Sequence, residues 1–204
     1  MYLHPAYLPN IANLALMAQE EIIWDISGNF QKQTYRNRTF IATDQGKLLL
    51  SIPVIHKGKS GHQNYKDILV DHSQPWMRTH WRGIETAYRT SPFFEYYEHY
   101  FKPLFEEQER YLIDFNLKSI EILLNCLQLP MPQKQNETYI KNLDPSIDRR
   151  FLIDAKRNLE YNSTEYHQVF SDKQGFIGNL SALDLICNEG PSAAAYLKNE
   201  ALDF

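Results

Sequence analysis

Short apolar runs separated by turn residues dominate the first third of the chain. The β-branched run at 21–26 predicts a buried strand that ends near Asp25. A helix is expected after Asn10, because residues of this type cap helices and apolar side chains then recur at helical spacing. A hairpin is expected around Gly46, which can supply the positive φ of a tight turn. Its two strands are expected at 39–42 and 47–52, and a further short strand at 67–71.

Beyond residue 73 the apolar period becomes that of helices. Apolar residues between Leu104 and Leu129 recur in steps of seven, four and three, which predicts one long amphipathic helix. Ser91 followed by Pro92 is typical of a helix start. The polar segment 133–150 is expected to be a surface excursion. Other helices are expected at 73–89, 181–190 and 193–197.

These elements predict an α/β or α+β fold. Its strand-rich N-terminal third and mostly helical C-terminal part are expected to pack as one domain over residues 1–204. The composition agrees with a packed globular chain, since 43% of the residues are hydrophobic and 23% are charged. Nothing in the sequence indicates an oligomeric state.

Charge and targeting signals narrow the classes of partner. The chain has 21 Lys and Arg against 25 Asp and Glu, and a net negative charge argues against a nucleic-acid partner. No apolar run approaches the length of a membrane span, so no membrane association is expected. The N-terminus resembles no secretory signal, and two cysteines make no disulfide scaffold. We therefore expect a cytoplasmic protein.

The standard sequence motifs of metal and cofactor sites are missing. There is no CxxC pair, HExxH, GxGxxG, P-loop or GxSxG motif, so no metal and no cofactor is predicted. A polar, basic loop is expected at 56–66. His56 and His62 in this loop could bind a metal adventitiously, but they lack carboxylate or thiolate partners at ligand spacing.

The densest polar cluster of the chain lies at 29–38, directly after the strand that ends at Asp25. If this segment is extended, alternation places Arg36 and Arg38 on one face. Two guanidiniums there could hold a carboxylate or phosphate. The alternative is a solvated edge strand whose charges discourage pairing with another sheet. The cluster also contains Lys32, Gln33, Tyr35 and Asn37.

Two helical segments carry further candidate residues. His80 shares a helix face with Trp76, and it could act as a general acid or base or be a core histidine satisfied by a carbonyl. Asn188 lies four residues after Asp184 in an apolar helix, so this pair either bonds locally or points into a site.

Several motifs in order resemble the WbqC-like family, bacterial proteins associated with surface-polysaccharide gene clusters. The opening Pro-x-Tyr-x-Pro element is matched at 5–9, and the Lys-Gln-x-Tyr-Arg-Asn-Arg block at 32–38. One departure is Gly28, where relatives commonly carry an acidic residue, whose role here is vacant or taken by Asp25. Further matches lie at 50–54, 76, 80–81, 88, 91–94, 166–170, 175–176 and 188–191.

The resemblance adds weight to a functional role for the cation–amide cluster. It supplies the context of surface-polysaccharide biosynthesis. Because the cluster follows a strand end, where α/β folds tend to place ligands, we expect a transferase-type enzyme that acts on an activated, anionic, nucleotide-sugar-like small molecule. In outline the opening is also similar to nucleotidyltransferase-like α/β folds. The alternative is a non-catalytic protein that binds a ligand or partner in a biosynthetic assembly, since no nucleophile or cofactor motif is visible.

Each candidate residue has an expected role in the enzyme. Arg36 and Arg38 would hold the anion, while Tyr35 and Asn37 would orient the substrate. A proton would be moved by His80 or Asp25. The other expected substrate contacts are His4, Tyr7, Lys32, Gln33 and Asn188.

Overall fold

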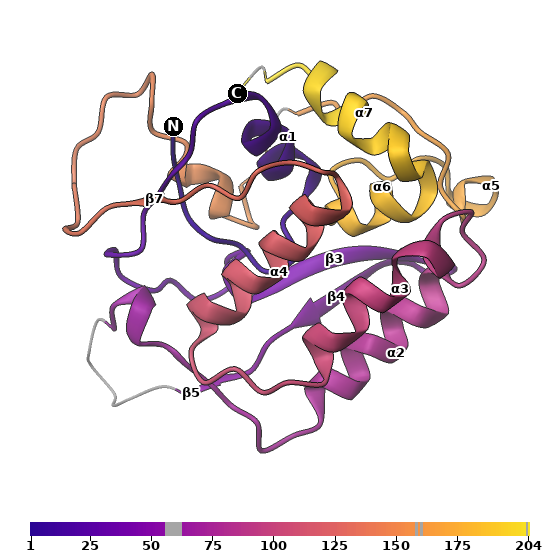
Figure 1. The fold of residues 1–204 in the computed structure, drawn as a ribbon, viewed down its shortest axis with the longest axis horizontal. Coiled ribbons are helices and arrows are strands. Elements are labelled where there is room, and N and C mark those ends of the chain that lie inside the picture. The colour runs from indigo at the N-terminus through magenta and orange to yellow at the C-terminus, as the bar shows by residue number, and fades with distance from the viewer. Residues whose placement is uncertain (56–62, 158, 160, 203) are drawn as a thin grey trace.

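The computed structural model describes residues 1–55, 63–157, 159, 161–202 and 204. The first seven residues of the expected basic loop, 56–62, lie outside the described residues, and so do both of its histidines. Helices and strands are mixed along the chain, which confirms the prediction of an α/β or α+β fold (Figure 1).

Three two-residue strands form a small parallel sheet. Its order is β1 (Tyr2–Leu3), β2 (Ile23–Trp24), β7 (Lys134–Gln135). β2 confirms the strand expected to end before Asp25. The prediction that 133–150 is only a surface excursion is wrong, because β7 adds a strand to β2 there. A two-residue strand with exposed side chains has no apolar pattern by which to recognise it.

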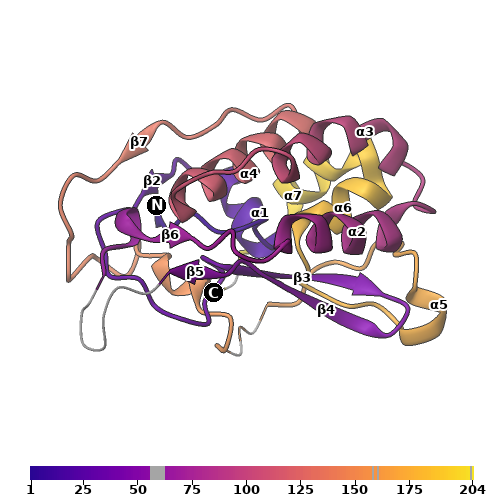
Figure 2. The same cartoon turned by 90° about the horizontal axis from the view of Figure 1, so that it is seen from below.

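Two antiparallel pairs make up the other described strands. β3 (Arg38–Thr43) and β4 (Gly46–Ser51) form the expected hairpin, with Gly46 at a φ of 101° in the turn. β5 (Val54–Ile55) pairs with β6 (Leu69–Val70), which confirms the short strand expected at 67–71. The helices α2, α3, α4 and α6 all lie on the same side of the β3–β4 hairpin (Figure 2).

Most helices form where the apolar period predicts them. Asn10 caps the first helix as expected, because its side chain accepts a hydrogen bond from the backbone N–H of Asn13. Ser181 caps the sixth in the same way. The α-helices are α1 (Ile11–Gln19), α2 (Trp76–Tyr88), α3 (Phe94–Phe101), α4 (Leu112–Cys126), α5 (Ser171–Gln174), α6 (Ala182–Glu189) and α7 (Ala193–Asn199). Short 3-10 helices span η1 (Tyr65–Asp67), η2 (Lys102–Phe105), η3 (Arg150–Ile153) and η4 (Gly190–Ser192).

Two helix predictions are wrong. The long helix expected over 104–129 is broken, because Leu104 belongs to η2 and α4 begins only at Leu112. Charged residues at 106–110 connect the two, and apolar side chains on both sides still reach the same core. Ser91 does not cap α3, since its hydroxyl donates back to the Tyr88 carbonyl.

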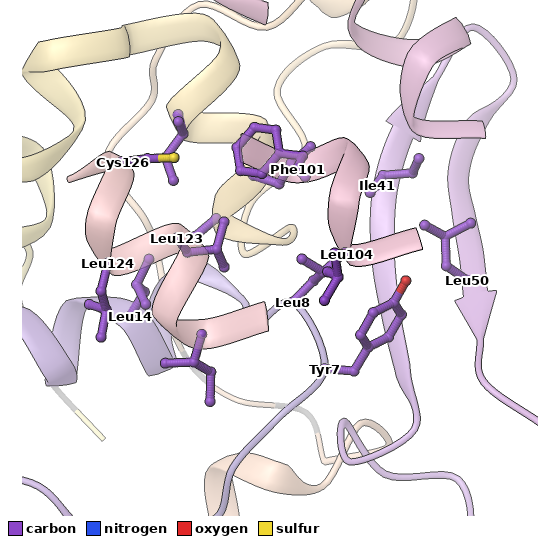
Figure 3. Packing of buried hydrophobic residues seen from close by; sticks show 14 of the residues in the cluster. Tyr7, Leu8, Leu14, Ile41, Leu50, Phe101, Leu104, Leu123, Leu124 and Cys126 are labelled. Carbon is purple, nitrogen blue, oxygen red and sulfur yellow. The ribbon is translucent and has the colours of Figure 1, made fainter. Parts of the chain in front are cut away.

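One core draws on residues from both ends of the chain. Its buried members run from Leu3 to Leu197, and Figure 3 shows Leu123 and Leu124 of α4 near Leu8 and Leu14 from the N-terminal segment. None of the helices formed by the described residues combines the length and the apolar character needed to cross a bilayer.

Candidate anion-binding site

The carboxyl ends of the three parallel strands each deliver one polar residue. His4 follows β1, Asp25 follows β2 and Asn136 follows β7, and the strand register places these three side by side. Backbone hydrogen bonds continue the ladder through them, from Asp25 N to Leu3 O at 2.8 Å and from Asn136 N to Trp24 O at 3.0 Å. Open α/β sheets bind ligands at this edge.

Asp25 lies at the centre of this row and is fully buried. Its Oδ1 accepts a hydrogen bond of 2.9 Å from Asn136 Nδ2, and its Oδ2 forms an ion pair of 2.9 Å with Arg150 Nη1. Burial raises the pKa of this carboxyl, but the bond from Arg150, the nearby His4 and the bond from Asn136 outweigh it and leave the pKa below its ordinary value.

Arg150 is held in place by a second carboxylate. Its Nε and Nη2 donate to the two oxygens of Asp148 at 2.9 and 2.7 Å, and its Nη1 also donates to the Ile140 carbonyl at 2.7 Å. Asp148 reaches this position because it pairs with Tyr2 beside β1. The Arg150 guanidinium therefore pairs with two carboxylates: Asp25, which follows β2, and Asp148, two residues before Arg150.

A cleft of about 350 Å³ opens over this edge of the sheet. The parallel-strand end contributes His4, and the loop after β2 contributes Gly28. The far wall contains Tyr139, Asp148 and Arg150, so much of the lining comes from the segment expected to be a surface excursion. Arg36 completes the lining, and we call this hollow the Arg36 cleft.

Arg36 is a buried cation that no described carboxylate neutralises. Its side chain is 2% exposed, and its Nε and Nη1 have no hydrogen-bond partner among the described residues. No carboxylate of the described residues lies within ion-pair distance of the Arg36 guanidinium. The guanidinium lies over the ring of Tyr65, 5.2 Å from its centroid, and burial lowers its pKa. An unpaired buried cation attracts an anion.

His4 is a neutral hydrogen-bond acceptor beside this cation. Its Nδ1 lies 2.7 Å from the Asp25 carbonyl oxygen, which can only accept, so Nδ1 carries the proton and Nε2 the lone pair. Burial and the charge of Arg36 lower the pKa of His4 to about 3, although the contact with Asp25 opposes this shift.

Two other predicted residues, Tyr7 and His80, lie together in the core and outside the Arg36 cleft. The Tyr7 hydroxyl and His80 Nδ1 are 2.9 Å apart, and His80 also packs edge-on against Trp76. Burial lowers the pKa of His80 to about 4. This surrounding fits the alternative of a satisfied core histidine.

The cation–amide block is not extended, so its side chains do not alternate. Residues 32–37 form turns, with Gln33 at a φ of 62°. Arg36 lines the Arg36 cleft, whereas Arg38 begins β3 outside it and Asn37 Nδ2 donates to the Ile52 carbonyl at 3.0 Å. Tyr35 lines a different hollow. Burial of Arg36 also excludes a solvated edge at that position.

The remaining predicted contacts lie away from the Arg36 cleft lining. Lys32 and Gln33 are exposed in the turn next to Gln31, which does line it. Asn188 is buried in α6, where its Nδ2 donates to the Asp184 carbonyl at 2.8 Å, so this pair bonds locally.

Gly28 lies against Tyr139 and His4, at the position where relatives are expected to carry an acidic residue. A Cβ there would meet the ring of Tyr139 at 3.4 Å and His4 Cε1 at 3.7 Å, which are ordinary contacts. A larger side chain at this position would enter the Arg36 cleft between these two rings.

Sequence patterns did not predict four residues at this site: Asn136, Tyr139, Asp148 and Arg150. They lie in a polar segment without periodicity, and the nearest sequence signal was the Asp-x-Arg spacing of Asp148 and Arg150, which is common on surfaces. No group of three or more His, Cys, Asp or Glu residues in the described ranges could hold a metal ion.

Comparisons with known proteins give one family match and one curated relative. The sequence profile of the WbqC-like protein family matches residues 4–160. "Uncharacterized protein Rv1507c" of Mycobacterium tuberculosis (strain ATCC 25618 / H37Rv) is 30% identical over 215 residues, covering 91% of this chain and 90% of that protein. No solved structure gives a significant match. The chain belongs to the WbqC-like protein family.

Proposed function

We propose that the Arg36 cleft binds a phosphorylated or nucleotide-linked sugar, and that the protein is a transferase-type enzyme acting on this molecule in surface-polysaccharide biosynthesis. The observation that carries the proposal is the unpaired guanidinium of Arg36. The two nearby carboxylates are both bonded to Arg150 and neither forms an ion pair with Arg36, so the guanidinium of Arg36 is left to contact a ligand.

The other groups of the cleft suit the sugar part of such a ligand. His4 Nε2 can accept a hydrogen bond from a hydroxyl, and the side chains of Asn29 and Gln31 add amide donors and acceptors. The Tyr139 ring offers an apolar wall, and a volume of about 350 Å³ is within the range of small-molecule sites.

Binding of the anion would also change the chemistry of His4. After burial, the positive charge of Arg36 is the largest cause of the low pKa of His4. A phosphate bound to Arg36 offsets that charge, so the pKa of His4 rises and its Nε2 becomes a stronger base next to the substrate hydroxyl. In this proposal His4 moves the proton, Asp25 positions Arg150, and His80 supports the core.

A second candidate function, a non-catalytic binding protein, is favoured by one observation. Both titratable groups at the strand ends, His4 and Asp25, have lowered pKa values and are therefore weak bases before ligand binds. The two candidate functions differ only in whether the bound ligand is turned over.

Calorimetric titration with glucose 1-phosphate, UDP-glucose and glucose tests the proposal. We expect the two anionic ligands to bind and glucose to bind much more weakly. Arg36→Gln should weaken anion binding about 10- to 100-fold, because a charge-assisted hydrogen bond contributes about 1.5–3 kcal/mol. Its melting temperature should change little, since no ion pair with a described residue is lost and only the contact with the Tyr65 ring is removed.

The matched control is Arg38→Gln, which removes the same charge two residues along and outside the Arg36 cleft. An equal loss of affinity in both variants, or no anion binding by the wild type, would contradict the site. Phosphorus NMR of UDP-glucose with a sugar acceptor then separates the candidates: turnover indicates the enzyme, and binding without turnover indicates the binding protein.

A further inference from the structure

A second hollow of about 320 Å³ lies behind the wall of the Arg36 cleft. The side chains of Tyr35 and Arg36 are consecutive, yet Arg36 lines the first cleft and Tyr35 lines the second. The same division holds in the facing segment, where Ile153 lines the first and Ala155 the second. The Tyr35 N–H donates to the Ile153 carbonyl at 2.8 Å, which ties the two segments together. We call the second hollow the Tyr35 cleft.

Half-buried aromatic rings form much of the Tyr35 cleft. Tyr35 and Phe40 meet edge to face with centroids 6.3 Å apart, and Tyr161 lies on another side of the lining. Partly exposed rings in a hollow leave apolar area in contact with water, which a planar ligand can cover. Stacking on aromatic side chains is the usual way in which proteins hold a base without reading its sequence.

Among the described residues, the charged side chains that line the Tyr35 cleft are both cations. Lys47 comes from β4 and Arg157 from the segment after η3, and neither has an ion-pair partner among the described residues. Arg157 lies over the Phe151 ring, 4.3 Å from its centroid. Asp154 and Glu200 lie near the Tyr35 cleft but do not line it. Burial raises the pKa of Tyr35, and the charge of Asp154 raises it further. Glu200 accepts a hydrogen bond of 2.5 Å from the Tyr161 hydroxyl.

We infer that the Tyr35 cleft binds a nucleoside phosphate, with its base against Tyr35 and Phe40 and its phosphate between Lys47 and Arg157. Aromatic rings next to unpaired cations match both halves of a nucleotide, whereas a neutral nucleoside or inorganic phosphate uses only half of the lining. The inference goes beyond the proposed function, because the Tyr35 cleft shares no lining residue with the Arg36 cleft and would hold a nucleotide of its own.

The test is a calorimetric titration of the full-length chain with UMP, AMP, uridine and inorganic phosphate. We expect both nucleotides to bind at least tenfold more tightly than uridine or phosphate. The double variant Lys47→Gln, Arg157→Gln should lose at least tenfold in nucleotide affinity, and both side chains are exposed enough to leave folding intact. Lys198→Gln, an exposed lysine on α7, is the matched control and should bind like the wild type.

The experiment tests the Arg36 cleft and the Tyr35 cleft separately. Arg36→Gln should bind UMP normally while losing glucose 1-phosphate. Nucleotide binding that depends on Lys47 and Arg157 supports the Tyr35 cleft even if no sugar phosphate binds, a result that would count against the proposed function alone. No nucleotide binding, or binding unchanged in the double variant, would overturn the inference.

Discussion

Four arginines of this chain differ in burial and in pairing. Arg149 and Arg150 are neighbours, but only Arg150 reaches the buried carboxylate of Asp25. Arg36 and Arg38 lie in one block, but only Arg36 is buried in a cleft with its charge unpaired. Its two ion pairs give Arg150 a structural role, whereas Arg36, which has no ion pair with a described carboxylate, can contact a ligand.

The buried histidines make stability depend on pH. Burial lowers the pKa of His80 to about 4, whereas an unfolded histidine titrates near 6.5. Between these values the unfolded chain binds more protons, so the free energy of unfolding falls as the pH falls. We expect the loss from His80 to reach about 2 kcal/mol at pH 5 relative to pH 7, measured by urea unfolding.

His80→Gln should reduce this pH dependence and leave the part that comes from His4, whatever its effect on stability at neutral pH. The exposed His99 provides the control, because His99→Gln should keep the wild-type slope. A slope in His80→Gln equal to that of the wild type would show that His80 is charged in the folded protein.

The sequence could identify a site residue only where that residue belongs to, or lies next to, a recognisable local motif. His4 and Arg36 belong to motifs that resemble the family, so both were predicted, although Arg36 was expected on a strand shared with Arg38. Arg150 could not be predicted, since its partner Asp25 lies 125 residues away and only the tertiary structure brings them together. His80 had the residue type of a catalytic base, but its surroundings are those of the core.

At the scale of elements, three very short strands build the site. Each of β1, β2 and β7 is two residues long, and a ladder this short contributes few hydrogen bonds of its own. The ion pairs of Arg150 stabilise the edge formed by the ends of these strands, because they connect the segment after β7 to Asp25 after β2. We infer that this arginine holds the sheet edge together.

Arg150→Gln should therefore destabilise the protein strongly. It leaves Asp25 buried without a countercharge, and breaking one side of a buried ion pair costs about 3–5 kcal/mol. Urea unfolding at neutral pH measures the loss. Arg149→Gln removes a half-buried neighbour that has no ion pair with a described residue, and it should cost less than about 0.5 kcal/mol. Similar losses in the two variants would contradict the role given to Arg150.

Elements with a strong local pattern were predictable and those defined by long-range pairing were not. Asn10 and Ser181 cap the helices they were expected to cap, and Gly46 forms the expected turn. β7 has exposed polar side chains and exists only because its backbone meets β2. The break before α4 was hidden because apolar residues on both sides of 106–110 keep helical spacing while contacting the same core.

At the scale of the whole molecule, the C-terminal helices belong to the same core as the N-terminal site. The family profile ends at residue 160, yet α6 carries fully buried Leu183, Leu185 and Ile186, and α7 packs against α1. The Tyr166 hydroxyl donates to Asp184 at 2.6 Å inside this part of the core. A family boundary in sequence is thus not a boundary in packing.

A chain truncated after residue 160 should fail to fold cooperatively. Removing α6 and α7 exposes the apolar faces of α1 and α4 that they cover, a loss far larger than the stability of a typical domain. Circular dichroism during thermal unfolding measures this, with the full chain as reference. A cooperative transition in the truncated chain at the wild-type temperature would contradict the expectation of one domain over 1–204.

The central claim is that an anion binds to Arg36 beside the free nitrogen of His4. Nitrogen NMR of the histidine rings at pH 7, during titration with glucose 1-phosphate, tests it most directly. The account predicts a saturable shift at His4 Nε2, an unchanged His80 and no His4 shift in Arg36→Gln. A His4 ring that does not respond to the wild type's ligand, or that responds equally in Arg36→Gln, would contradict it.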